Sequence, residues 1–191
     1  MDLHAVLSLL TLAALVLTAV VCDLRSRRIP NALVASGTVL GLFLAAVAPA
    51  GGGLLGHSAG AMGIVPALLG GLLGLALFLP LYALRAMGAG DAKLLAMVGV
   101  WLGAPAVAWA ALWTLLAGGV LSLAWALGTG VLGRVLANLR EMVWGSVVRL
   151  QAGAGASLAP PPTPTGRLPY AVAIACGTAA EEVRRVTPAF G

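Results

Sequence analysis

The stretch MGAGDAKLLA (residues 87–96) places an aspartate and a lysine two positions apart, between two long apolar runs. Such a polar interruption is rare in this chain, because 61% of its 191 residues are hydrophobic and only 9% are charged. Soluble domains carry about 25% charged residues. The composition therefore predicts an all-α integral membrane protein, and the stretch marks a boundary between membrane helices and water.

The apolar runs predict six transmembrane helices in a single membrane-embedded domain, residues 1–191. A helix needs about 20 apolar residues to cross about 30 Å of hydrocarbon. The predicted spans are 3–22, 32–48, 61–84, 94–102, 106–127 and 168–180. The fourth is short, and it approaches a full span only if its helix begins near Asp91. We therefore expect a six-transmembrane-helix bundle with mainly short loops.

The distribution of basic residues predicts which segments face the cytoplasm. Lys and Arg gather in 23–31, 85–93 and 128–167, whereas the loops 49–60 and 103–105 contain none. Because basic residues favour the cytoplasmic side, the first three segments are expected there. Six spans place both termini outside, but Arg184 and Arg185 in the tail argue against a fully exported C-terminus, so its side stays open. The net charge of +5 thus has a topological explanation, and nucleic-acid binding is not expected.

The segment 128–167 is expected to form a cytoplasmic loop with two parts. Residues 133–151 place an apolar face opposite polar residues, which predicts an amphipathic helix in the membrane interface, anchored by Trp144. Residues 152–166 are rich in Pro, Gly, Ser and Thr, which is typical of a linker. We interpret both parts as a spacer between the fifth and sixth spans.

Two of the six acidic residues, Asp23 and Asp91, stand at cytoplasmic ends of apolar helices. The other four lie at the N-terminus, on the amphipathic segment and in the C-terminal tail: Asp2, Glu141, Glu181 and Glu182. A folded bundle could bring Asp23 and Asp91 together. Two adjacent carboxylates cannot both ionise cheaply, so one keeps its proton. The ionised partner can then take a proton from water while the protonated partner polarises a scissile carbonyl.

Each aspartate also has a structural explanation. Asp23 can pair with Arg25 or Arg27. Asp91 can cap the fourth helix, where a carboxylate is favoured by roughly 0.3–1 kcal/mol. The sequence alone leaves these alternatives open.

The residues around Asp91 favour close approach of a peptide and argue against a metal site. Gly88 and Gly90 lack a Cβ and tolerate positive φ, so the backbone there can approach a substrate. No histidine cluster and no CxxC pair exists. His4 and His57 are both predicted on the outer side, far from the aspartates. Neither a metal nor another cofactor is expected.

Three motifs together resemble those of the type IV prepilin peptidases. DLRSRRIPN (23–31) resembles their first aspartate motif, GAGDAK (88–93) their GxGDxK motif, and GRLPYAVAIA (166–175) their C-terminal PYxxAIA segment. The resemblance implies a membrane aspartic endopeptidase that removes the short basic leader from prepilins or pseudopilins after a glycine. Cleavage would occur at the cytoplasmic face of the bacterial inner membrane. Asp23 and Asp91 match the two catalytic aspartates.

The resemblance also implies supporting positions. Lys93 matches the lysine of the second motif, with a structural or electrostatic role. Pro30 and Asn31 are expected to shape the entry to the second helix, because proline fixes φ and Asn can bond the first exposed N–H groups. The other candidate supporting or substrate-binding residues are Arg25, Gly88, Gly90, Pro169 and Tyr170.

The chain departs from the larger bifunctional members of that family. Those carry a cytoplasmic extension, often with CxxC pairs, that is associated with N-methylation of the mature pilin. Here Asp23 follows the first span without such an insert. We therefore expect peptidase activity without N-methyltransferase activity, as in the compact peptidases of Tad/Flp pilus systems, with the pilus assembly machinery as a candidate partner.

Three other functions were weighed against a leader peptidase. A small proton-coupled transporter could use the aspartates as a relay, but it should carry carboxylates deeper in its helices. A non-catalytic assembly subunit should tolerate replacement of either aspartate. A presenilin-like protease that cuts inside the bilayer disagrees with the boundary position of both residues.

Overall fold

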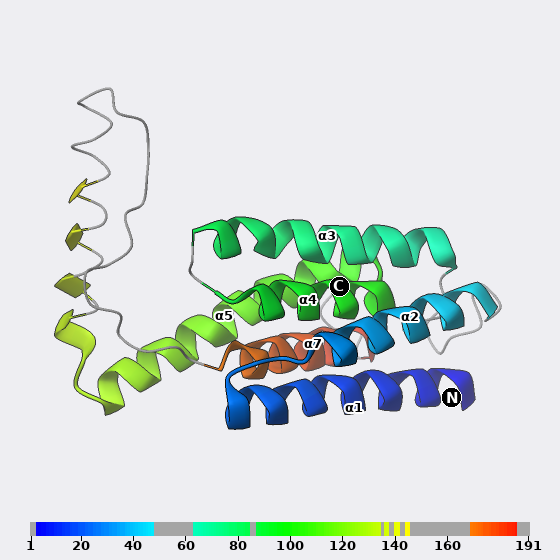
Figure 1. Cartoon of the computed structure of the whole chain (residues 1–191), viewed down its shortest axis with the longest axis horizontal. Coiled ribbons are helices and arrows are strands. Elements are labelled where there is room, and N and C mark those ends of the chain that lie inside the picture. The colour runs from blue at the N-terminus through cyan, green and yellow to red at the C-terminus, as the bar shows by residue number, and fades with distance from the viewer. Residues whose placement is uncertain are drawn as a thin grey trace. The chain divides into compact units, whose positions relative to one another are not determined.

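The computed structural model describes residues 3–47, 63–84, 87–134, 136–137, 140–141, 144–145 and 169–186. Within these residues the chain forms helices and no strands (Figure 1), which confirms the all-α prediction. The helices are α1 (Leu3–Ser26), α2 (Asn31–Val47), α3 (Ile64–Ala83), α4 (Ala89–Leu102), α5 (Ala104–Gly128) and α7 (Tyr170–Val186).

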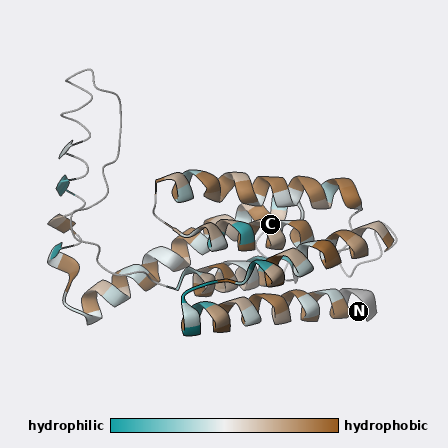
Figure 2. Ribbon diagram, viewed as in Figure 1, coloured by the Kyte–Doolittle hydropathy of each residue, from teal (hydrophilic) through white to brown (hydrophobic). Residues whose placement is uncertain are grey.

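Three of the described helices are long and apolar enough to cross a membrane: Val6–Ser26, Ile64–Ala83 and Ala104–Gly128. Helix α2 is apolar but shorter. Helix α4 has 14 residues, or about 21 Å, against about 30 Å of hydrocarbon. Hydrophobic residues dominate the helices, and hydrophilic ones gather at the end of α1 and in the segment after it (Figure 2). A multi-pass membrane protein is thus supported, while the count of six spans stays a prediction.

Both aspartates lie on helices. Helix α1 continues past the predicted span to Ser26, so Asp23, expected at the end of this helix, lies within its last turn. Arg27 ends α1 with a left-handed φ of 53°, a conformation that is uncommon for a residue with a side chain. Helix α4 begins at Ala89, which places Asp91 in its first turn.

Helix α4 is the central helix of the bundle and contacts α1, α2, α3 and α7. Its buried residues are Ala92, Leu94, Leu95, Met97, Val98, Gly99, Val100, Trp101 and Leu102. A helix that is apolar on all sides is expected inside a bundle rather than on its surface. The fold therefore encloses the helix that carries Asp91.

Glycines allow α3 and α4 to pack backbone against backbone. A Cβ on Gly70 would collide with the carbonyl oxygen of Gly99 and lie 2.7 Å from the Cα of Gly103. A Cβ on Gly99 would in turn collide with the carbonyl oxygen of Gly70. Helix α2 is tied to α4 by the Trp101 indole N–H, which donates to the carbonyl oxygen of Gly37 at 2.9 Å. Small residues at helix contacts are typical of membrane bundles.

The chain divides into two compact units. The first unit, Met1–Gly118 with Pro169–Gly191, holds α1 to α4, most of α5, and α7. The second unit is Gly119–Leu168. Within it, the described positions of the predicted amphipathic segment are helical, and Leu136 and Trp144 are exposed. The remaining positions of that segment and the linker 152–166 lie outside the described residues.

Candidate active site

Asp23 is buried near the end of α1, with 8% of its surface exposed. Its Oδ2 accepts a hydrogen bond from the backbone N–H of Ala171, at 3.2 Å. Ala171 is the second residue of α7, and the N–H groups in the first turn of a helix have no partner within that helix. Asp23 therefore accepts one of the N–H groups left unpaired at the N-terminus of α7. The contact links α1 to α7, although the two helices lie far apart in the sequence.

Asp91 is the third residue of α4, and its Oδ2 accepts the N–H of Gly88 at 3.0 Å. It caps its own helix, as the structural explanation predicted. Asp91 lies outside the three helices long enough to span a membrane. Burial raises the pKa of its carboxyl to about 6; the Gly88 hydrogen bond opposes this rise, and the charge of Asp23 adds to it. The two carboxylates are thus close enough to influence each other.

The segment after α1 packs against the start of α4, so the first two motifs are neighbours. A Cβ on Gly90 would lie 3.3 Å from the Cβ of Ile29. The Lys93 ammonium donates to Oδ1 of Asn31 at 3.1 Å. The carbonyl oxygen of Pro30 accepts two N–H groups from the first turn of α2. Contacts between residues about 60 positions apart therefore fix this corner of the bundle.

Two local expectations need correction. Gly88 has a φ of −80° and a ψ of 154°, an extended backbone open to any residue, and Gly90 lies inside α4. Neither glycine therefore uses its tolerance of positive φ, and close approach of a peptide to them stays a prediction. Gly90 is packed against Ile29. Asn31 was expected to bond the N–H groups at the start of α2, but its amide oxygen receives Lys93.

The Lys93–Asn31 contact predicts a measurable coupling. Both side chains are exposed, so we expect Lys93→Met and Asn31→Ala each to lower the free energy of unfolding by about 0.5–1 kcal/mol. The double variant should lose no more than the worse single one, because both changes remove the same bond. Unfolding of the four proteins by SDS in mixed micelles measures this. Strictly additive losses would contradict the contact.

The third motif lies at the same end of the bundle. Tyr170 begins α7 directly after Pro169 and is half-buried. Its ring meets that of Phe78 edge-on, with centroids 6.3 Å apart and planes at 71°. Burial raises the pKa of the Tyr170 hydroxyl, and the charge of Asp91 adds to this rise. All three motifs therefore meet around the two aspartates, whereas Arg25 is exposed in the last turn of α1.

Several residues at the site had no signal in the sequence. Ala171 acts through its backbone N–H, which nearly every residue type offers. Ile29 and Phe78 contribute apolar contacts that resemble many others in so hydrophobic a chain. Only their position in or near the quoted motifs distinguishes Ala171 and Ile29 from other residues.

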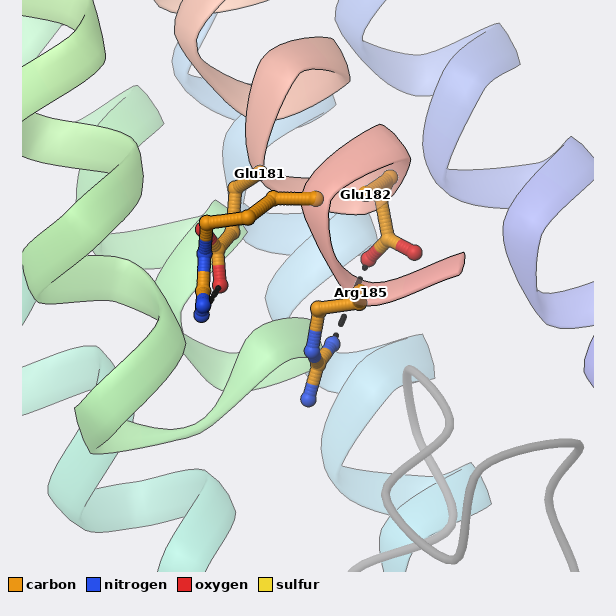
Figure 3. A network of polar contacts seen from close by, with 4 residues as sticks. Glu181, Glu182 and Arg185 are labelled. Atoms are coloured by element: carbon orange, nitrogen blue, oxygen red, sulfur yellow. Dashed lines mark hydrogen bonds and ion pairs between the residues drawn. The ribbon is translucent and has the colours of Figure 1, made fainter. Parts of the chain in front are cut away.

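A second polar cluster lies in the far half of α7, at Glu181 and Glu182, for which the sequence predicts a C-terminal tail. Helix α7 continues through both, and Glu181 is fully buried. Arg184 donates two hydrogen bonds to the Glu181 carboxylate, at 2.7 and 2.8 Å. Arg185 donates to Glu182 at 3.4 Å (Figure 3). Each carboxylate in this half of α7 thus has an arginine partner.

This cluster is separate from the site at the aspartates. Glu181 lies about 16 Å along α7 from Tyr170, at 1.5 Å per residue. The Arg184 guanidinium also lies 5.2 Å from the ring centroid of Trp109 on α5. A buried charge is tolerated in a membrane bundle when it is paired in this way. We therefore interpret the cluster as a structural contact between α5 and α7.

Comparison with known proteins gives one match. The model of the type IV leader peptidase family matches residues 10–127. The matched region includes Asp23 and Asp91 and ends before the motif at Pro169. No curated protein and no solved structure matches the chain.

Proposed function

Since the chain belongs to the type IV leader peptidase family, we propose that it is an aspartic endopeptidase that removes the leader peptide from Flp-like type IV prepilins. Family membership supports leader peptidase activity and prepilin substrates in general. The apolar helices support a multi-pass protein of the inner membrane. The observation that supports the proposed chemistry is that the segment after α1 packs against the start of α4, through Ile29 with Gly90 and Asn31 with Lys93. The charge of Asp23 accordingly contributes to the raised pKa of the Asp91 carboxyl.

We propose that Asp23 and Asp91 share one proton and activate water between them. The ionised carboxylate accepts a proton from water, and the resulting hydroxide attacks the carbonyl carbon of the scissile peptide bond. The protonated carboxyl donates a hydrogen bond to the carbonyl oxygen as negative charge develops there. When the C–N bond breaks, a proton passes to the leaving amine, and the pair returns to its starting state.

The electrostatics of the pair support such sharing. Two carboxylates in one site hold a proton more tightly than either would alone in water. The pKa of Asp91 is raised to about 6 by burial and, in smaller part, by Asp23. Its carboxyl therefore keeps a proton at a higher pH than an exposed aspartate would, which a proton donor near neutral pH requires.

We place this end of the bundle at the cytoplasmic boundary of a six-span, single-domain protein. The adjoining segments carry Arg25, Arg27, Arg28 and Lys93, and basic residues favour the cytoplasmic side. A prepilin could then lie beside the site with its hydrophobic helix in the bilayer and its basic leader in the cytoplasm. The pilus assembly machinery is a natural partner at that surface.

We further propose that the protein cleaves without methylating. The segment between α1 and α2 is only four residues long, and the chain contains no CxxC pair. Both features match the compact peptidases of Tad/Flp systems rather than the bifunctional members. We assign no cofactor to the reaction.

The alternative functions explain the site less well. A proton-coupled transporter needs a titratable carboxylate within the helices, and Glu181 occupies such a position. Its bidentate pairing with Arg184 holds it as a compensated charge, which is unsuited to carrying a proton. A non-catalytic assembly subunit would give no reason for Asp23 and Asp91 to share one end of the bundle.

The proposal is tested with the purified full-length protein in lipid nanodiscs. Synthetic prepilin segments that contain the leader and the first hydrophobic helix are the substrates, and S-adenosylmethionine is present. We expect a single cut after the leader glycine and a free, unmethylated N-terminus on the product, both read by mass spectrometry. Intact peptides, or cutting inside the hydrophobic helix, would count against a leader peptidase.

A further inference from the structure

The first turn of α7 contacts Asp23, one of the two aspartates of the proposed pair, and lies near the other, Asp91. The Ala171 N–H donates to Oδ2 of Asp23 at 3.2 Å, and Tyr170 lies within electrostatic range of Asp91. A hydrogen bond of this length is at the long end of the usual N–H···O range. A small shift of α7 would therefore break it, so whatever fixes this turn also fixes the geometry of the site.

Tyr170 is held from two sides, by α3 and by α5. On the α3 side its ring meets Phe78 edge-on. On the α5 side the phenol lies against the buried Gly118. A Cβ at position 118 would stand 2.6 Å from the Tyr170 hydroxyl oxygen, 2.8 Å from Cζ and 3.0 Å from Cε2. Optimal contacts between such atoms are about 3.5–4.0 Å, so any side chain at position 118 displaces the ring.

We propose that Gly118 is a positioning residue for hydrolysis. Because Gly118 has no side chain, α5 has a slot at this position that the Tyr170 ring fills. The ring in turn holds the first turn of α7 where the Ala171 N–H donates its hydrogen bond to Asp23. The inference rests on the proposed function. Gly118 acts through Tyr170 and Ala171, not through a group of its own. This role has no signal in the sequence, because Gly118 lies in an apolar run that contains a second, adjacent glycine.

The chain supplies two matched control positions for this slot. Gly119 is the next residue of α5, and a Cβ there would meet nothing within 4 Å. Gly177 lies further along α7, where a Cβ would stand 2.6 Å from both the Ala110 carbonyl oxygen and the Thr114 nitrogen of α5. Gly119→Ala thus controls for the added methyl group. Gly177→Ala controls for a steric overlap between α5 and α7 at a position away from Tyr170.

The test measures kcat and KM for leader cleavage by the full-length protein in nanodiscs. We expect Gly118→Ala to lower kcat by about 10- to 100-fold, because misplacement of reacting groups by about 1 Å costs up to 100-fold. KM should change little, because Gly118→Ala alters the geometry of the two carboxylates and not the surface on which the prepilin segment binds. Gly119→Ala should leave both constants at wild-type values.

A second change separates positioning from general damage. The hydroxyl oxygen of Tyr170 is the atom nearest to the added methyl, so Tyr170→Phe relieves the closest contact. We expect Gly118→Ala with Tyr170→Phe to recover at least about fivefold in kcat over Gly118→Ala alone, a non-additive effect. Tyr170→Phe should give no recovery to Gly177→Ala. If Gly118→Ala does not fold, Tyr170→Leu empties the slot instead and should lower kcat by a similar factor.

The outcomes distinguish this inference from the function on which it rests. A wild-type protein that does not cleave prepilin segments overturns the proposed function and the inference with it. A wild-type protein that cleaves, with Gly118→Ala as active as Gly119→Ala, overturns the inference alone. Additive effects of Gly118→Ala and Tyr170→Phe, or wild-type kcat in Tyr170→Leu, also overturn it.

Discussion

Asp23→Asn and Asp91→Asn are each expected to abolish leader cleavage while leaving the protein folded and inserted in the membrane. Asparagine has nearly the shape of aspartate, but its amide neither accepts a proton from water nor holds one for the leaving amine. We expect each rate to fall by at least ~10³-fold, as for residues of other catalytic units. The amide oxygen of Asn can still accept the N–H of Ala171 or Gly88, so both local contacts survive.

The measurement is the initial rate of leader release by the wild type, both single variants and the double variant, with thermal unfolding of each in detergent. The double variant should be no slower than either single one, because the two carboxylates act as a unit. Glu141→Gln, a carboxylate-to-amide change on the second unit, is the control and should be fully active. A folded single variant that keeps a tenth of the wild-type rate would exclude a shared dyad.

Gly70→Ala is expected to be the most destabilising small substitution in the bundle. The added Cβ would collide with the backbone at Gly99 and Gly103, and neither can move aside as the end of a flexible side chain can. Overpacking of this kind costs about 1–3 kcal/mol, and we expect the upper part of that range. Because α4 carries Asp91, the same change should also lower the cleavage rate.

SDS unfolding of Gly70→Ala, Gly99→Ala and Gly119→Ala tests this expectation. Gly99→Ala should lose a similar amount, since its Cβ would collide with the carbonyl oxygen of Gly70. Gly119→Ala should be neutral or slightly stabilised, because Ala is favoured over Gly within a helix by about 1 kcal/mol. Equal stability of all three variants would mean that α3 and α4 do not cross at their glycines.

The sequence predicts that both aspartates lie at helix ends beside basic segments, and the structure places Asp23 in the last turn of α1 and Asp91 in the first turn of α4. Composition identified a membrane protein, and the few charged residues marked helix ends. Because Asp23 and Asp91 both stood beside basic segments, topology alone predicted that they share one end of the bundle. The structure adds that Asp91 also caps α4. The structural and the catalytic explanation of this residue are therefore compatible.

Other features depend on three-dimensional packing and could not be predicted. Glu181 was assigned to a solvated tail because four charged residues follow a short apolar run, but α7 continues and Arg184 compensates its charge. Gly118 and Gly119 are adjacent in the sequence, and only the position of Tyr170 distinguishes them. Gly88 and Gly90 tolerate positive φ by residue type, but neither adopts it, because Gly88 is extended and Gly90 lies within α4.

The proposed dyad is tested by the intact mass of a prepilin co-expressed with this protein in cells that lack another leader peptidase. With the wild type, we expect a pilin shortened by its leader and carrying no methyl group. With Asp23→Asn or Asp91→Asn present at wild-type level in the membrane, we expect the full-length prepilin. A shortened pilin with either variant, or a full-length prepilin with the wild type, would show that the two aspartates are not the catalytic pair of a leader peptidase.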